Sequence, residues 1–407
     1  MDLRSLPTGL TPEQRCTERR SHVEHALSID LFALTPREGS IGHADEKNCE
    51  QMLGHVPIPV GYAGPLKVTF SSGETSEIHL PLATTEGALV ASVNRGCKAL
   101  SQAGGVRLSS IHHGMTRSMA FRAADIQNLS AILKKREAEW KQIGHSTSNH
   151  LKILTYDVDI KDDHLFLTIS CDTDEAMGMN MVTIAAQKIG EWIESECDDV
   201  TFVTVAGNVD SDKKPSKRTH DRGRGYEVTA TAEISEEVLK EVLKTSSEAM
   251  LATAHAKLTL GSEIAGAIGR NLHAANIFAA LYLATGQDAA HVVEGSLTET
   301  TIQPLPTVAS AKVGSNHSAP AHRSLGEGGI RISVRCPAIL VGIRGGGTTL
   351  PAQSQCLQML MKPKTALHPK AQLAESIGAA VLAGEISLLA AQASHSLAQA
   401  HTRLGRT

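Results

Sequence analysis

The sequence predicts an α+β fold in which a small α+β domain is inserted into a larger, mainly helical domain. Two observations support this prediction. Helix-like and strand-like segments alternate between residues 119 and 205, whereas long helical patterns dominate residues 235–256, 262–286 and 371–403. The chain therefore divides into an N-terminal helical segment, a large domain in two pieces and a small domain: residues 1–48, residues 49–118 with 206–407, and residues 119–205.

Proline and glycine punctuate the chain before the small domain. A helix is predicted over residues 12–26 of the charged N-terminal segment. Residues 56–65, Val-Pro-Ile-Pro-Val-Gly-Tyr-Ala-Gly-Pro, are predicted to be extended or turning, because each proline disfavours helix at the residue before it. After two strand-like runs, Thr84 is the predicted N-cap of a helix that ends at Gly104 and Gly105.

Residue type and period predict the elements that follow. Those of the small domain are a helix over 125–143, strands over 151–160 and 164–171, a helix over 181–193 and a strand over 200–205. A charged loop, residues 210–225, then leads to a strand over 226–232. Residues 303–330 are rich in Ser, Pro, His and Gly without periodicity, so we expect an exposed loop there. A glycine-rich element, residues 341–348, precedes the last long helix.

Composition excludes several classes of protein. A chain of 407 residues can form two or three packed domains, so a small fold held together by disulfides or metal is excluded as the main architecture. A formal charge of -4 and 3% aromatic residues argue against a nucleic-acid partner. No segment reaches the roughly 20 apolar residues that span a bilayer, so no membrane partner is expected. The 7 cysteines are widely spaced without a Cys-x-x-Cys pair, which fits reduced thiols and a cytoplasmic location.

A glycine-containing loop of the small domain could bind an anion. The strand over 164–171 runs into Asp172-Thr-Asp-Glu-Ala-Met-Gly-Met-Asn180, and a helix follows. A turn with Gly178 at a helix N-terminus would present free N–H groups to a phosphate. The alternative is a structural role, in which the turn caps the helix and the methionine side chains fill the hydrophobic core. No Gly-x-Gly-x-x-Gly follows a strand, so a Rossmann site is not supported.

Four further residues could carry chemistry, and each also has a structural interpretation. Glu86 could be a capping charge in the first turn of its helix, and Lys213 could belong to a solvated charge run. Asp288 follows a helix and could be part of a stop turn, and His401 could lie in a frayed tail. Spacing alone does not show that the four converge.

Several motifs, in order along the chain, resemble one family, the 3-hydroxy-3-methylglutaryl-coenzyme A (HMG-CoA) reductases of the class I type. The resemblance covers their soluble catalytic portion. It rests on Val56-Pro-Ile-Pro-Val-Gly-Tyr-Ala-Gly-Pro-Leu66, Thr84-Thr-Glu-Gly-Ala-Leu-Val-Ala-Ser-Val-Asn-Arg-Gly-Cys97, Gly114-Met-Thr-Arg117, Ala176-Met-Gly-Met-Asn-Met181, Asp212-Lys-Lys-Pro215, His273-Ala-Ala-Asn-Ile277, Gly286-Gln-Asp288, Gly345-Gly-Gly-Thr348 and Leu382-Ala-Gly-Glu-Ile-Ser-Leu-Leu389.

The resemblance implies a two-step reduction of HMG-CoA to mevalonate and free coenzyme A with two reduced nicotinamide cofactors and no metal. Lys213 matches the lysine that stabilises the developing oxyanion. Glu86 matches the general acid, and Asp288 matches the aspartate coupled to both, whose proximity would raise the pKa of Glu86. His401 matches the histidine that protonates the departing thiolate, carried on a closing C-terminal tail.

The resemblance also implies the binding residues and the assembly. Arg117 matches the arginine that holds the substrate carboxylate. The other expected substrate-binding residues are Ser92, Asn94, Lys214, Lys257 and Asn276. The expected cofactor-binding residues, on a ferredoxin-like small domain, are Ser148, Asn149, Glu175, Ala176, Met177, Gly178, Met179 and Asn180. The large domain would bind HMG-CoA around a central helix. A homodimer or homotetramer with active sites at the subunit interface, near residues 50–54, is expected.

Two departures from the family pattern concern the cofactor, and two other functions stay open. Glu175 stands where the family has aspartate, and Asn149 stands where an arginine lies near the 2′-phosphate. We therefore expect NADPH, with NADH possible.

The alternatives are a catalytically weakened paralogue that binds coenzyme A thioesters, and a thioester-dependent aldehyde dehydrogenase with Cys97 as nucleophile. Cys97 lies on an apolar helix face with Val90 and Val93, which favours a core position.

Overall fold

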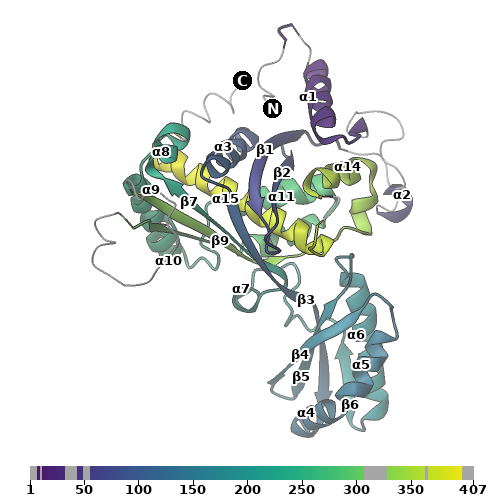
Figure 1. Ribbon diagram of the computed structural model, residues 1–407. Coiled ribbons are helices and arrows are strands. Elements are labelled where there is room, and N and C mark those ends of the chain that lie inside the picture. Colours follow the sequence, from purple (N-terminus) through teal and green to yellow (C-terminus); the bar gives the residue numbers. More distant parts are fainter. Residues whose placement is uncertain are drawn as a thin grey trace.

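One long strand, β3 (Val106–Ala123), runs through both parts of the molecule. The structure is a computed structural model, and it describes residues 7–9, 12–32, 44–48, 56–306, 328–362 and 365–396. The first half of β3 pairs with β7 (Gly225–Ser235) in one sheet. Its second half pairs with β5 (His164–Asp172) in a smaller body that Figure 1 shows below the rest of the molecule.

The larger body is built on a mixed sheet with the strand order β2-β1-β3-β7-β9-β8. Strands β1 and β3 are parallel, and the other neighbours in this order are antiparallel. The strands not yet bounded are β1 (Val60–Thr69), β2 (Thr75–Ala83), β8 (Glu299–Pro304) and β9 (Gly329–Ile339).

Helix α15 (Pro369–Ala393) lies at the centre of the larger body, against the sheet and helix α3 (Leu89–Gln102). The contact with α3 is close: a Cβ at Gly96 would lie only 1.9 Å from the carbonyl oxygen of Ala383. Among the described residues, α15 is the one helix long and apolar enough to cross a membrane, and 94% of its most apolar window is buried inside the protein. Its apolar composition therefore serves the core.

Other helices surround this core. They are α1 (Pro12–Leu27), α2 (Ala44–Lys47), α7 (Lys217–Arg222), α8 (Glu236–Val238), α9 (Ser247–Ala254), α10 (Ser262–Ala265), α11 (Ala274–Thr285), α12 (Val292–Gly295) and α14 (Pro351–Leu360). Two π-helical segments, η2 (Leu239–Leu243) and η3 (His255–Gly261), and two 3-10 turns, η4 (Ala289–His291) and η5 (Gly346–Thr349), complete the larger body.

The smaller body has its own hydrophobic core. Apolar side chains of the second half of β3 and of β5 pack there with buried residues of the helices, including Trp140, which is fully buried. The remaining elements of this body are α4 (Ile126–Lys135), α5 (Glu137–His145), β4 (Lys152–Lys161), α6 (Met179–Glu196) and β6 (Val200–Thr204). These match the predicted alternation, except that Arg136 divides the predicted helix over 125–143 in two.

The prediction of a mainly helical large domain understated its strands. Its core is built on the mixed sheet. Strand β8 ends, and strand β9 begins, within residues 303–330, which were predicted to be a loop. Residues 307–327 of that segment lie outside the described residues. Strand β8 is mostly exposed or partly exposed, and β9 alternates only in its first half; the exposed Thr301, Gln303 and Arg331 lower the apolar content of the two strands. Such edge or half-exposed strands give a weak sequence signal.

Two of the three predicted long helices are interrupted. The helix over 235–256 breaks at Lys244, which has a positive φ of 58°, and Ser246 then caps α9 by accepting from the N–H of Ala249. The helix over 262–286 breaks at Gly266, with φ 65°. Ser-rich and glycine-containing stretches favour caps and turns over a continuous helix. The third helix ends at Ala393 rather than continuing to residue 396, and the rest of the predicted range lies outside the described residues.

Candidate active site

Lys213 and Asp288, two of the predicted catalytic residues, form an ion pair. The Lys213 Nζ lies 2.6 Å from the Asp288 Oδ2, and both side chains are partly exposed. Asp288 also caps η4 by accepting from the N–H of Ala290. Partial burial would raise the pKa of Asp288, but hydrogen bonds from Lys213 and Ala290 outweigh it and lower the pKa. The carboxylate is therefore a stable anionic partner for the ammonium group.

A buried charge network lies beneath this pair, centred on Arg224, whose side chain is 1% exposed. Its Nη1 lies 2.9 Å from the Asp212 carboxylate and 3.1 Å from that of Glu294. Glu294 in turn accepts a 2.7 Å hydrogen bond from the backbone N–H of Lys213. Arg224 therefore fixes the backbone of the loop that carries Lys213, which adopts a positive φ of 57°.

His291 connects this network to the exposed pair. Its imidazole is fully buried, with Nδ1 3.3 Å from the Glu294 carboxylate and Nε2 3.7 Å from that of Asp288. Asp212, His291 and Glu294 form a group whose geometry could hold a metal ion. The Arg224 guanidinium already contacts two of the three, Asp212 and Glu294, so the network contains its own cation.

Arg117, the predicted substrate-carboxylate ligand, joins the same network from β3. Its Nη1 lies 3.5 Å from the Asp210 Oδ2, and its Nε and Nη2 donate to the Thr183 hydroxyl. Burial raises the pKa of Asp210, although Arg224 and Arg117 oppose the shift. Arg117 is therefore anchored through a buried carboxylate that it shares with Arg224, 3.8 Å from Asp210.

Glu86 lies in the connection between β2 and α3, not in the first turn of a helix as predicted. Helix α3 begins only at Leu89, after Ala88 with φ 72°, and Thr84 accepts from the N–H of Glu86 instead of capping the helix. The Glu86 side chain is exposed, and its carboxylate makes no hydrogen bond or ion pair within the described part of the chain. Its coupling to Asp288 stays a prediction.

Several predicted substrate-binding side chains have structural partners in this state. Ser92 donates to Ser387 of α15, and Asn94 accepts from the N–H of Gly64. Lys214 is exposed and donates to the Asp212 carbonyl. Lys257 and Asn276 are partly exposed on η3 and α11. His401 and residues 50–54 lie outside the described residues.

The predicted cofactor loop closes tightly before α6. Gly178, with φ 90°, is the N-cap, and a Cβ there would lie 2.3 Å from Thr173. The first N–H groups of a helix have no intrahelical partners, so those of Met179, Asn180 and Met181 suit an anion. Ala176 and Met177 complete the turn, and Thr173 donates to the carbonyls of both.

Glu175 of this loop and the neighbouring Ser148–Asn149 turn differ in what they contact. Glu175 forms an ion pair with Arg344, so the longer carboxylate at this position has a partner from the larger body. Ser148 accepts from the N–H of His150, and Asn149 is exposed. His150 lies 2.8 Å from Asp174 of the loop, which places the Ser148–Asn149 turn beside it.

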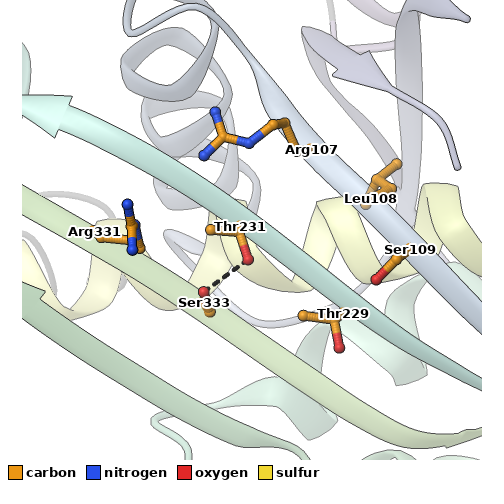
Figure 2. Close-up of a pocket in the computed structure, with 7 residues that line it drawn as sticks. All are labelled: Arg107, Leu108, Ser109, Thr229, Thr231, Arg331 and Ser333. Atoms are coloured by element: carbon orange, nitrogen blue, oxygen red, sulfur yellow. Dashed lines mark hydrogen bonds between the residues drawn. The ribbon is translucent and has the colours of Figure 1, made fainter. Parts of the chain in front are cut away.

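An open depression occurs on another face of the molecule and contains none of the predicted residues. Figure 2 shows its lining on β3, β7 and β9, with a hydrogen bond between Thr231 and Ser333. The lining residues are Arg107, Leu108, Ser109, Thr229, Thr231, Arg331 and Ser333. Without a titratable cluster resembling that around Lys213, it is a poor candidate for the reaction centre.

Sequence reasoning missed Arg224, His291 and Glu294. His291 and Glu294 follow Asp288 by three and six residues, a spacing that places them on one side of successive helical turns. Arg224 lies between two glycines in a charged loop, where an exposed position is the natural expectation. Only their burial beside Lys213 shows their importance.

Comparison with solved structures defines the fold class. The class II HMG-CoA reductase of Streptococcus pneumoniae, bound to NADPH in open conformations, matches with a TM-score of 0.68 over 92% of this chain and 96% of that chain, at 18% identity. A second structure of the reductase of Streptococcus pneumoniae gives a TM-score of 0.66 at 18% identity, over 92% of this chain and 96% of that chain. These likenesses show a mixed α/β fold shared with those structures.

Sequence comparison identifies the family. Residues 15–406 match the family model of hydroxymethylglutaryl-coenzyme A reductase. The HMG-CoA reductase of Haloferax volcanii is 39% identical over 410 residues, 99% of this chain and 96% of the relative. That of Methanocaldococcus jannaschii is 37% identical over 400 residues, 95% of this chain and 92% of the relative. The chain belongs to the HMG-CoA reductase family of oxidoreductases, as the motifs predicted.

Proposed function

We propose that this chain reduces HMG-CoA to mevalonate and free coenzyme A with two equivalents of NADPH, as a class I-type reductase. The observation that carries the proposal is the Lys213–Asp288 ion pair, held over the buried Arg224 network beside Arg117. The class I assignment rests on the motifs, and the chain is only 18% identical to the class II structures.

In this proposal, Lys213 supplies the cation for a substrate carbonyl that gains negative charge. The reduced dinucleotide supplies hydride when bound. Lys213 donates to the substrate oxygen, and the electrostatic stabilisation of that oxygen is greatest when it becomes an oxyanion. Asp288 holds the ammonium group of Lys213 through the ion pair, and Glu294 fixes the backbone of Lys213 by accepting a hydrogen bond from its N–H. Arg117 binds the carboxylate end of the substrate through its remaining donors.

Two proton transfers are assigned to Glu86 and His401. Glu86, whose side chain is exposed in the connection between β2 and α3, donates a proton at the aldehyde stage. His401 donates a proton to the coenzyme A sulfur as the C–S bond breaks, so that coenzyme A leaves as the neutral thiol. Both roles rest on the family motifs.

We assign cofactor binding to residues 119–205, as a ferredoxin-like domain, and substrate binding to residues 49–118 and 206–407, after the N-terminal segment 1–48. Separate hydrophobic cores in the two bodies support this division. Glycine at position 178, with a Cβ excluded by Thr173, leaves the N-terminus of α6 open to the pyrophosphate. The residues present thus fit a dinucleotide, and no metal is part of the proposal.

We also propose a homodimer or homotetramer with active sites at the subunit interface. Leu260 and Ile264 support it, because their side chains are 47% and 89% exposed on neighbouring turns near Lys257. The cytoplasmic location is supported by free thiols at Cys97, Cys171, Cys197, Cys336 and Cys356.

HMG-CoA-dependent oxidation of NADPH tests the function. We expect two NADPH oxidised per mevalonate formed. Lys213→Ala and Glu86→Gln should each abolish turnover while leaving NADPH affinity near normal, because neither residue lies on the cofactor loop. Lys217→Ala is the matched control, since this neighbouring lysine is exposed and pairs with Asp221 at the surface. Full activity in Lys213→Ala would overturn the assignment, and binding without turnover in the unmodified protein would favour the weakened paralogue.

A further inference from the structure

A buried lysine of the central helix contacts the loop assigned to the cofactor. Lys370 lies in the first turn of α15, and only 3% of it is exposed. Its Nζ donates to the Thr173 hydroxyl and to the Ala176 carbonyl, each at 3.1 Å. Lysine is rarely buried without such partners, so these contacts explain its position.

Lys370 completes a turn that already closes on itself. The Thr173 hydroxyl donates to the Ala176 carbonyl at 2.8 Å and accepts from Lys370. One ammonium group thus holds both ends of the turn that leads into Gly178. Removing it would leave the Ala176 carbonyl with fewer donors and the loop with one attachment fewer to α15.

A neighbouring contact joins the same loop to the same end of α15. His368, the N-cap of α15, lies 3.6 Å from the Asp174 carboxylate. The side chains of His368 and Asp174 are both partly exposed, at 43% and 46%, so this contact is weaker than the buried one. Lys370 is therefore the main link from α15 to the loop.

The loop is also tied to the Asp288 segment. Ile343 donates its N–H to the Glu175 carbonyl, and Gln287 makes two hydrogen bonds with the backbone of Gly342, at 2.9 and 3.0 Å. Gln287 directly precedes Asp288. The cofactor loop and the catalytic pair therefore share one framework, to which Lys370 adds a charged anchor.

The charge of Lys370 is only partly compensated within the protein. Among the described residues, the carboxylate paired with Lys370 is that of Asp172, which lies 3.9 Å from Nζ and is 40% exposed. Burial lowers the pKa of Lys370, and Asp172 and Asp174 oppose that shift. A cation behind the N-terminus of α6 adds to the positive end of the helix dipole, which favours an anionic ligand there.

We propose that Lys370 is a positioning residue for NADPH: it holds the 173–178 turn in the shape that exposes the N-terminus of α6 to the pyrophosphate. This inference rests on the proposed function, since it assumes that the loop binds the dinucleotide. It assigns no role to Lys370 in the chemical step.

The test is Lys370→Met, which keeps the length of the side chain but removes its charge and donors. We expect the KM for NADPH to rise about tenfold or more, with kcat within threefold and the KM for HMG-CoA within twofold of the unmodified enzyme. Lys370→Arg should recover at least a third of the lost affinity. A merely structural defect would lower the active fraction, and so kcat, without changing the KM for NADPH.

Lys362→Met is the matched control, because this partly exposed lysine precedes the same helix and pairs with Glu74. If Lys370→Met does not fold, Thr173→Val removes the loop side of the contact and should weaken NADPH in the same way. Direct titration with NADPH, without HMG-CoA, separates this inference from the proposed function. If the variant that folds binds NADPH with an affinity within twofold of the unmodified protein, the role of Lys370 is overturned. If the unmodified protein binds NADPH normally but does not turn over, the proposed function alone is overturned.

Discussion

Replacement of Arg224 by methionine gives the sharpest test of the buried network. The Arg224 guanidinium is 1% exposed and lies 2.9, 3.1 and 3.8 Å from the carboxylates of Asp212, Glu294 and Asp210. Methionine fills a similar volume but leaves these carboxylates without their main cation. Removing one partner of a buried ion pair costs about 3–5 kcal/mol, so we expect a loss of that size in the free energy of unfolding at pH 8.

The loss should depend on pH in a defined direction. Burial already raises the pKa of Asp210 above its usual value, and Arg224 is the largest opposing influence. Without Arg224 the folded-state pKa rises further above the unfolded one. The folded variant then binds more protons than the unfolded chain, so its unfolding free energy falls as pH rises through this window. The defect should therefore be greater at pH 8 than at pH 5.

Urea unfolding at both pH values measures this effect. Arg331→Met is the control, because its side chain is 50% exposed and pairs with Glu233 at the surface, where ion pairs contribute little. A loss in Arg224→Met below about 1 kcal/mol at pH 8, or one that does not shrink toward pH 5, would refute the reasoning that this network is a compensated buried charge cluster.

Two other predictions follow from single side chains. Cys97→Ala should retain turnover, because the thiol is fully buried on α3 and its burial raises its pKa, so no thiolate is available as a nucleophile; loss of all activity in the folded variant would instead favour the dehydrogenase alternative. Asp288→Asn should abolish turnover and remove part of the acid dependence of stability. The folded-state pKa of Asp288 is lowered from 3.8, so its ionised form stabilises the folded protein above that value. This stabilisation is lost as pH falls through the folded-state pKa. The difference in unfolding free energy between the two proteins should therefore shrink in acid. A difference independent of pH would contradict the assigned ion pair.

Local patterns predicted the smaller body well. The strands near residues 151–160 and 164–171 and the helix after Gly178 all form close to their predicted bounds. Their apolar residues recur at the period of the element, so the signal is contained within each segment. The larger body was predicted less well, because half-exposed strands and Ser- or Gly-interrupted helices carry weaker local signals.

The sequence by itself determined the family and the identity of most candidate site residues, because contiguous motifs carry that information. It also determined the apolar character of α15, whose burial its composition requires. Tertiary structure alone decided which residues meet: Lys213 with Asp288, Arg224 with Glu294, and Lys370 with the loop at Thr173. A charged side chain becomes buried only when distant segments supply its hydrogen-bond partners and counter-charges, and no local pattern contains that information.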